Sequence, residues 1–370
     1  MEQTAVEKKF GKYVMASMIT MFLQSAYSMI DGLFVSNLIG DTALSAVNVA
    51  WPVIAVVTAI GTGVGCSGAV MMSTKQGEGK NEESNIVRAN VILALLASSI
   101  VVTILFLILL TPLLKLMGAE GELLRLSQIY GRVMLTGGVL QILSCGLTPL
   151  LRNDNRAVSA MMIMVGGLFA NLGLDFVFMY VFHMGIGGAA GASLCAQLFT
   201  TLCCLIILGT KKTDPIRFSQ FMIRKEYWKK IFKTAVSPFG ISLTPSLLIL
   251  YHNVACLKFG GDLAVNAYAL ISSTVGSYRV LLIGVAEGIQ PLASYAYGAH
   301  DFHAIRKIRN KAIITAMSVS FFLFIFTIAT AWFYPAIYGY EGEAAELGYH
   351  AVMVTAAQLI FTGLVRVTNS

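Results

Sequence analysis

Two acidic side chains stand inside long apolar stretches of this sequence, where a charge is costly unless it binds an ion or a proton. Asp31 follows Gln24 and Tyr27 at helical spacing, so the three share one face of a helix. A second stretch, NLGLD, puts Asn171 and Asp175 four residues apart. Two carboxylates with amide oxygens beside them predict a site for a hard monovalent cation or a bound proton.

Each acid also has a plainer explanation, in which it only hydrogen-bonds a neighbouring helix. A third acid, Glu287, follows Arg279 by eight residues in a later apolar run. These two either form a buried pair that fixes helix contacts or take part in transport, and we expect them to be secondary to the main site.

Composition places the chain in a membrane. The 370 residues are 56% hydrophobic and 12% charged, with a mean hydropathy of +0.75, which a soluble domain does not show. The net charge of +7 is spread over short segments between apolar runs, so no nucleic-acid partner is expected. The six cysteines lie inside apolar runs without metal-binding spacing and are interpreted as packing residues.

Ten apolar runs are long enough to cross a bilayer as helices and too long for barrel strands. The sequence therefore predicts an all-α integral membrane protein. The predicted helices are 12–37, 44–72, 86–111, 124–150, 157–182, 187–209, 228–257, 263–297, 308–333 and 346–367. Four glycines crowd the second of them and predict close helix packing rather than a phosphate loop: Gly61, Gly63, Gly65 and Gly68.

The distribution of basic residues predicts the orientation. With the N-terminus in the cytoplasm, 21 of the 26 Lys and Arg fall on the cytoplasmic side. Both termini are then cytoplasmic, and the chain is a multi-pass protein of the cell's inner (plasma) membrane.

An internal repeat appears when the chain is compared with itself at the offset that aligns Gly40 with Gly261. Nine identical pairs occur in 49 aligned positions without a gap, and Arg88 with Arg309 is one of the nine. The repeat predicts a six-helix lobe at 1–210, an inter-lobe loop at 211–227 and a second lobe at 228–370. The second lobe holds four of six expected helices, so ten of twelve helices are present.

The chain resembles the multidrug and toxic compound extrusion (MATE) family. The resemblance rests on YSMIDGLFVSNLIGDTALSAVN near the N-terminus, NLGLD in the fifth helix and QPLASYAYGA before the loop at 300–311. It implies two pseudo-symmetric six-helix lobes. It also implies that Asp31, Asn171 and Asp175 bind the coupling cation, with Tyr27 and Ser193 beside them. Some members use an acid in the seventh helix, but residues 227–257 contain none.

The resemblance also implies an antiporter that exports drugs or other amphipathic or cationic compounds in exchange for H⁺ or Na⁺. The rival function is a lipid-linked oligosaccharide flippase of the same superfamily, which needs more cations in its helices than Arg132 and Arg279. An enzyme is not expected, since no Ser-His-Asp set or HExxH motif occurs. We expect no cofactor, a monomer, and small molecules and the lipid bilayer as partners.

Overall fold

The computed structural model describes residues 3–210, 220–337 and 342–368, and this part of the chain contains helices and no strand. The predicted all-α fold is therefore confirmed. The helices are α1 (Gln3–Ile39), α2 (Asp41–Gly77), α3 (Asn81–Leu116), α4 (Gly121–Thr136), α5 (Gly138–Leu151), η1 (Arg152–Arg156), α6 (Ala157–Asp175), η2 (Phe176–Val181), α7 (Gly185–Gly209), α8 (Lys225–Gly298), α9 (Phe302–Thr330), α10 (Phe333–Ile337) and α11 (Gly342–Thr368).

Eight helical stretches within the described residues are long and apolar enough to cross a membrane. The predicted helix 124–150 is in fact two, α4 and α5, divided at Gly137. The predicted helices 228–257 and 263–297 both lie in α8, whose backbone leaves helical geometry at Gly261. The short α10 and the π-helical turns η1 and η2 have no counterpart in the prediction. The count of ten helices out of twelve stays a prediction.

The backbone repeats at the same offset as the sequence. Three pairs of residues with positive φ show it: Gly40 (117°) and Gly261 (61°), Gly79 (76°) and His300 (53°), and Gly121 (54°) and Gly342 (57°). Each pair lies at a break between helices, and the same offset aligns the first residues of α3 and α4 with those of α9 and α11. The corresponding turns of the two halves are therefore built alike.

The chain forms two compact units. One comprises Met1–Ser25, Thr244–Ala296 and Asp301–Ser370, and the other Ala26–Leu243 and Tyr297–His300. Helices α1 and α8 each contribute residues to both units. The predicted lobe boundary at 211–227 stays a prediction, because residues 211–219 lie outside the described part of the chain.

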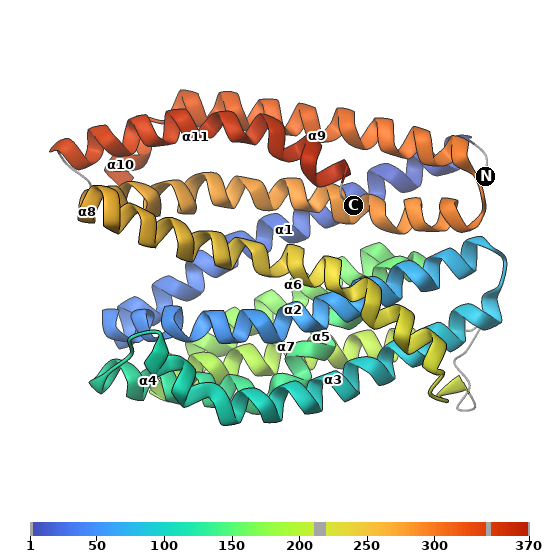
Figure 1. Cartoon of the computed structure of the whole chain (residues 1–370), viewed down its shortest axis with the longest axis horizontal. Coiled ribbons are helices and arrows are strands. Elements are labelled where there is room, and N and C mark those ends of the chain that lie inside the picture. Colours follow the sequence, from blue (N-terminus) through green and yellow to red (C-terminus); the bar gives the residue numbers. More distant parts are fainter. Residues whose placement is uncertain (1–2, 211–219, 338–341, 369–370) are drawn as a thin grey trace. The chain divides into compact units, whose positions relative to one another are not determined.

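In the unit formed mainly by Ala26–Leu243, α2 is the central helix and packs against α3, α4 and α5 (Figure 1). A Cβ atom on Gly65 would lie under 3.0 Å from backbone atoms of Gly146 in α5, and one on Gly61 equally close to Ile142. These glycines let the two helices touch backbone to backbone. The predicted close packing at the glycines is confirmed.

A buried ion pair joins α3 to the turn between α5 and α6. Arg88 Nη2 donates to Asp154 Oδ1 at 3.0 Å, and both side chains are 0% exposed. Gln76 of α2 donates through Nε2 to the same oxygen at 2.9 Å. Three elements are thus tied together beside Asn155, whose φ of 62° marks the sharp turn into α6.

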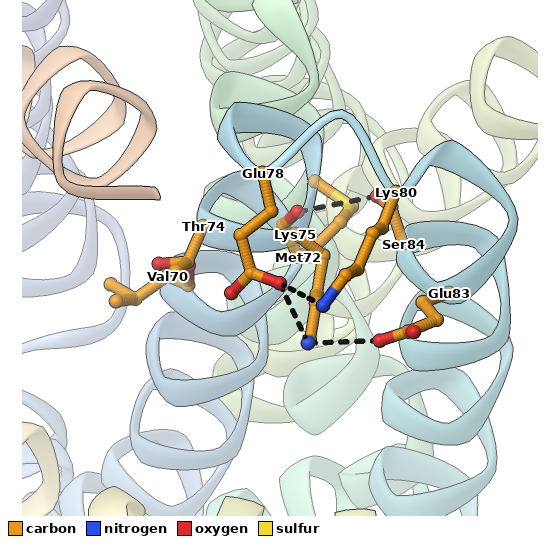
Figure 2. Close-up of polar contacts among 8 residues, drawn as sticks. All are labelled: Val70, Met72, Thr74, Lys75, Glu78, Lys80, Glu83 and Ser84. Carbon is orange, nitrogen blue, oxygen red and sulfur yellow. Dashed lines mark hydrogen bonds and ion pairs between the residues drawn. The ribbon is translucent and has the colours of Figure 1, made fainter. Parts of the chain in front are cut away.

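The turn between α2 and α3 carries a second, exposed ion network (Figure 2). Glu78 accepts from Lys75 and from Lys80, each at 2.9 Å, and Lys75 also bridges to Glu83 at 2.8 Å. The hydrogen bond from Lys75, followed by that from Lys80, holds the pKa of Glu78 below its ordinary value. Figure 2 also shows Ser84, whose Oγ donates to the Met72 carbonyl at 3.2 Å and so ties α3 to α2.

In the other unit, α9 and α11 run side by side (Figure 1). A Cβ atom on Gly363 would lie under 3.0 Å from Ala316, so this contact also depends on a glycine. Tyr278 of α8 shares a hydrogen bond of 2.8 Å with Tyr334, and Tyr334 shares one of 2.7 Å with Thr330. This hydroxyl chain links α8, α9 and α10.

Candidate cation-binding site

Three helices of the unit Ala26–Leu243 supply the predicted site. Tyr27 and Asp31 lie one turn apart on α1, Asn171 and Asp175 one turn apart on α6, and Ser193 on α7. Because residues four apart share a helix face, each pair presents both of its side chains in one direction. Helices α6 and α7 pack against each other, which brings Ser193 near the pair on α6.

Hydrogen bonds join the predicted residues into one chain. Tyr27 Oη donates to Asn171 Oδ1 at 2.5 Å, and Asn171 Nδ2 donates to Asp175 Oδ2 at 2.8 Å. The hydroxyl of Tyr27 is also within hydrogen-bonding reach of Ser193. Asn171 is 5% exposed and Asp175 is fully buried. The amide of Asn171 therefore connects a phenol to a buried carboxyl.

The carboxyl groups of Asp31 and Asp175 lie within hydrogen-bonding reach of each other. Because an ionised carboxylate only accepts hydrogen bonds, the two groups can share one only when one of them carries a proton. Among the described residues, neither Asp31 Oδ1 nor Asp175 Oδ1 has a hydrogen-bond partner, although both atoms are buried. These two oxygen atoms are therefore available to a proton or a small cation.

Tyr130 of α4 is a site residue that the sequence did not reveal. It is 5% exposed and interacts electrostatically with both Asp31 and Asp175. Tyr130 lies on α4, and no acidic residue lies one helical turn before or after it. The local sequence therefore does not distinguish Tyr130 from a tyrosine that only packs.

The other three predicted residues, Gln24, Arg279 and Glu287, all belong to the other unit. Gln24 is exposed and belongs to the segment Met1–Ser25, which groups with the other unit. Arg279 and Glu287 on α8 are both half-buried, and each interacts electrostatically with Arg366 of α11. The structure thus gives these two residues a shared neighbour on another helix.

The site's chemistry follows from the two acids. Two carboxylates in contact repel each other strongly in a poorly hydrated interior, so a proton or cation must neutralise one charge. Two acids this close can therefore hold a proton or cation as one unit rather than as two independent groups. Asn171 and Tyr27 fix the orientation of Asp175 through directed hydrogen bonds.

Comparison with known proteins agrees with this architecture. The MatE family model matches residues 16–177 and 241–370. The chain is 22% identical over 365 residues to the multidrug export protein MepA of Staphylococcus saprophyticus and 24% identical over 370 residues to MepA of Staphylococcus aureus strain N315. Both alignments cover 98% of this chain and 80% of the relative.

The fold is also shared with solved structures. An outward-facing multidrug resistance MATE family transporter of the MOP superfamily superposes with a TM-score of 0.92 at 24% identity, covering 98% of this chain and 81% of that one. A MOP superfamily transporter from Pyrococcus furiosus superposes with a TM-score of 0.87, covering 98% and 84%. Because the family model covers most of its length, this chain belongs to the MATE family of membrane transporters.

Proposed function

We propose that this protein is an antiporter that exports drugs or other amphipathic, cationic compounds, driven by cation entry at the Asp31–Asp175 pair. The close approach of these two carboxyl groups carries the proposal, since a bound proton or cation relieves their repulsion. The MepA relatives are multidrug export proteins, which supports the substrate class. No cofactor is required, because the ion gradient supplies the energy.

The hydrogen-bonded chain favours H⁺ over Na⁺ as the coupling ion. Asn171 already uses Oδ1 to accept from Tyr27 and Nδ2 to donate to Asp175. A proton between the acids leaves these bonds intact, whereas Na⁺ needs several oxygen ligands and a rearranged amide. We therefore propose H⁺, with Na⁺ as the alternative outcome of the test below.

Coupling requires the proton and the drug to favour different conformations. Protonation neutralises the acid pair and lets α1 move against α6, with the segment Asp31–Gly32 as the bending point. A Cβ atom on Gly32 would be 3.8 Å from its nearest neighbour, the Leu44 side chain, so this position is loosely packed. Deprotonation restores the repulsion and returns the transporter to the state that accepts a drug.

The proposal includes a location and an assembly state. The protein works as a monomer in the cell's plasma membrane, with both chain ends on the cytoplasmic side, as the basic residues favour. A flippase for lipid-linked oligosaccharides is not favoured, since the relatives named above export drugs.

The test measures ethidium efflux from vesicles that contain the purified protein, under an imposed pH or Na⁺ gradient. Asp31→Asn and Asp175→Asn should each abolish gradient-driven efflux, and the double variant should lose little more, because the pair acts as one unit. Efflux driven by Na⁺ alone would assign the coupling to Na⁺.

Glu122→Gln serves as the control, since Glu122 is an exposed carboxylate paired with Arg125 at 2.6 Å. This variant should transport like the unaltered protein. Unaltered efflux by a correctly inserted Asp31→Asn protein would overturn the proposal.

A further inference from the structure

The first turns of α8 pack against α2 along one narrow face. Ile231 and Ala235 are buried, and Ser67 of α2 donates a hydrogen bond of 2.9 Å to the carbonyl oxygen of Ile231. The chain just before α8 is held as well, because the backbone N–H of Arg224 donates to Asn90 Oδ1 at 2.9 Å. With one face fixed against α2 and α3, the opposite face of this end of α8 is defined.

Three lysines occupy that opposite face. Lys225, Lys229 and Lys233 follow one another at intervals of four residues, so they form one row along the helix. The row lies on the side of α8 away from Ile231 and Ala235, since these two positions point about half a turn from it. All three lysines are exposed. We call them the lysine row.

The charge of this segment is strongly positive. Residues 224–233 contain five basic side chains and a single acid, Glu226, and all six are exposed. The basic ones are Arg224, Lys225, Lys229, Lys230 and Lys233. None of the five forms an ion pair with another described residue. Because they are exposed, their charges can meet a partner outside the protein.

Apolar side chains continue the exposed surface on both sides of the lysines. Met222 and Ile223, just before the helix, are exposed, and so is Val236, just after the row. Phe232 shares the face of the row and meets Trp228 edge to face, with ring centroids 5.9 Å apart. Cations with apolar and aromatic neighbours are typical of a surface that lies where phospholipid headgroups meet acyl chains.

We propose that residues 222–236 form a docking surface for the headgroups of anionic phospholipids, in the leaflet next to the predicted inter-lobe loop. The lysine row contacts the headgroup phosphates, while Phe232 and Val236 face the acyl chains. A cluster of basic residues beside a membrane helix attracts anionic lipids, and each lysine favours them over zwitterionic lipids about fivefold. The predicted membrane helix 228–257 begins inside the row, which places the lysines at the membrane surface. This binding does not depend on the antiport function.

Quenching of Trp228 fluorescence measures which lipid lies beside the docking surface. The other two tryptophans, Trp51 and Trp332, are exposed and are replaced by Phe in the full chain. The protein is placed in vesicles of equal parts phosphatidylglycerol and phosphatidylcholine, with bromine near the headgroup end of the acyl chains of one lipid or the other. We expect brominated phosphatidylglycerol to quench Trp228 more strongly. Equal quenching by the two lipids would overturn the proposal and leave the lysines only a role in orienting the chain.

Substitutions in the lysine row separate the effect of charge from an effect on folding. Lys229→Gln should lower the preference for phosphatidylglycerol about fivefold, whereas Lys229→Arg should keep it, since arginine retains the positive charge. Lys115→Gln is the matched control, because Lys115 is an exposed lysine in the last turn of α3, and it should leave the preference unchanged. An equal preference in Lys229→Gln and the unaltered protein would contradict the role of the row.

A soluble competitor distinguishes a lipid headgroup from a free phosphate compound. Glycerol phosphate at millimolar concentration carries the same anionic group without acyl chains, and sodium chloride of equal ionic strength controls for screening. We expect neither to change the quenching of Trp228 by brominated phosphatidylglycerol, because the lipid is concentrated at the membrane surface. Loss of quenching with glycerol phosphate alone would assign the surface to soluble phosphate compounds and overturn the lipid proposal.

Discussion

Asn171 uses both ends of its amide group, so its neighbours fix its orientation. The oxygen accepts from Tyr27 and the nitrogen donates to Asp175. A flipped amide would turn its oxygen toward the Asp175 oxygen that now accepts from the amide nitrogen. The site is therefore ordered by the direction of its hydrogen bonds as well as by its charges.

Removing the hydroxyl of Tyr27 tests this order. Tyr27→Phe leaves the buried Asn171 oxygen without its donor, which should lower the free energy of unfolding by about 1–3 kcal/mol. Chemical denaturation in detergent micelles measures the change, and ethidium efflux should fall with it. Tyr180→Phe is the matched control, because Tyr180 is 55% exposed. Equal stability of the two variants would contradict the hydrogen-bond chain.

Glu78 gives a prediction for how the stability of the protein depends on pH. Its pKa is lowered in the folded protein by hydrogen bonds from Lys75 and then Lys80, from an ordinary value of 4.5. Because the pKa of Glu78 is lower in the folded than in the unfolded protein, ionised Glu78 stabilises the fold. This stabilisation is complete above the pKa of the unfolded protein and is lost as the pH falls through the pKa of the folded protein. The stability difference between the unaltered protein and Glu78→Gln should therefore be constant above about pH 5 and shrink below about pH 4. A difference that persists unchanged to pH 3 would contradict the ion network at this turn.

Between elements, the ion pair of Arg88 and Asp154 connects α3 to the start of η1. Both charges are withdrawn from solvent, so each compensates for the desolvation of the other. The pair lies beside a sharp turn whose Asn155 has positive φ, and it holds α3, α2 and η1 in one arrangement.

Breaking this pair should destabilise the protein strongly. Asp154→Asn leaves a buried guanidinium without its counter-charge, at a cost of about 3–5 kcal/mol. Replacing both partners, Arg88→Met with Asp154→Leu, should recover much of that loss, since neither charge of the pair then remains buried. Unfolding in denaturant measures both variants. Glu122→Gln, in an exposed pair, should change little. A double variant as unstable as Asp154→Asn would show that the pair does more than balance charge.

For the whole molecule, the repeat and the basic residues together predict the topology. Glu78 and Ala299 hold corresponding places in two turns that the repeat aligns with each other. Both are exposed, as is Glu122 in the next turn of the first half. A parallel repeat places corresponding turns on the same side of the membrane.

Labelling with a membrane-impermeant maleimide tests the topology. In a chain whose six native cysteines are replaced, Glu78→Cys and Ala299→Cys should react in inside-out vesicles and Glu122→Cys in right-side-out vesicles. Reaction of Glu78→Cys and Ala299→Cys from opposite sides would contradict a parallel repeat.

The sequence by itself determined that the long apolar runs are helical. A bilayer leaves backbone groups no partners except within a helix, so an apolar run of sufficient length must be helical whatever surrounds it. The sequence also predicted that Tyr27 shares a helix face with Asp31, and Asn171 with Asp175. It further revealed the repeat that aligns Gly40 with Gly261. The spacings depend on residues close together in the chain, and the repeat needs only a comparison of the sequence with itself.

Only the tertiary structure decided which helices meet. Membrane helices are apolar on most faces, so their sequences hold little information about which neighbour each face contacts. The bond from Tyr27 to Asn171 joins residues 144 positions apart, and Tyr130 interacts with the acids from α4, where no acidic residue lies at helical spacing from it. The break at Gly137 inside the predicted helix 124–150 was equally hidden. Packing between distant segments set these features, because glycine contacts and buried hydrogen bonds form only when the helices come together.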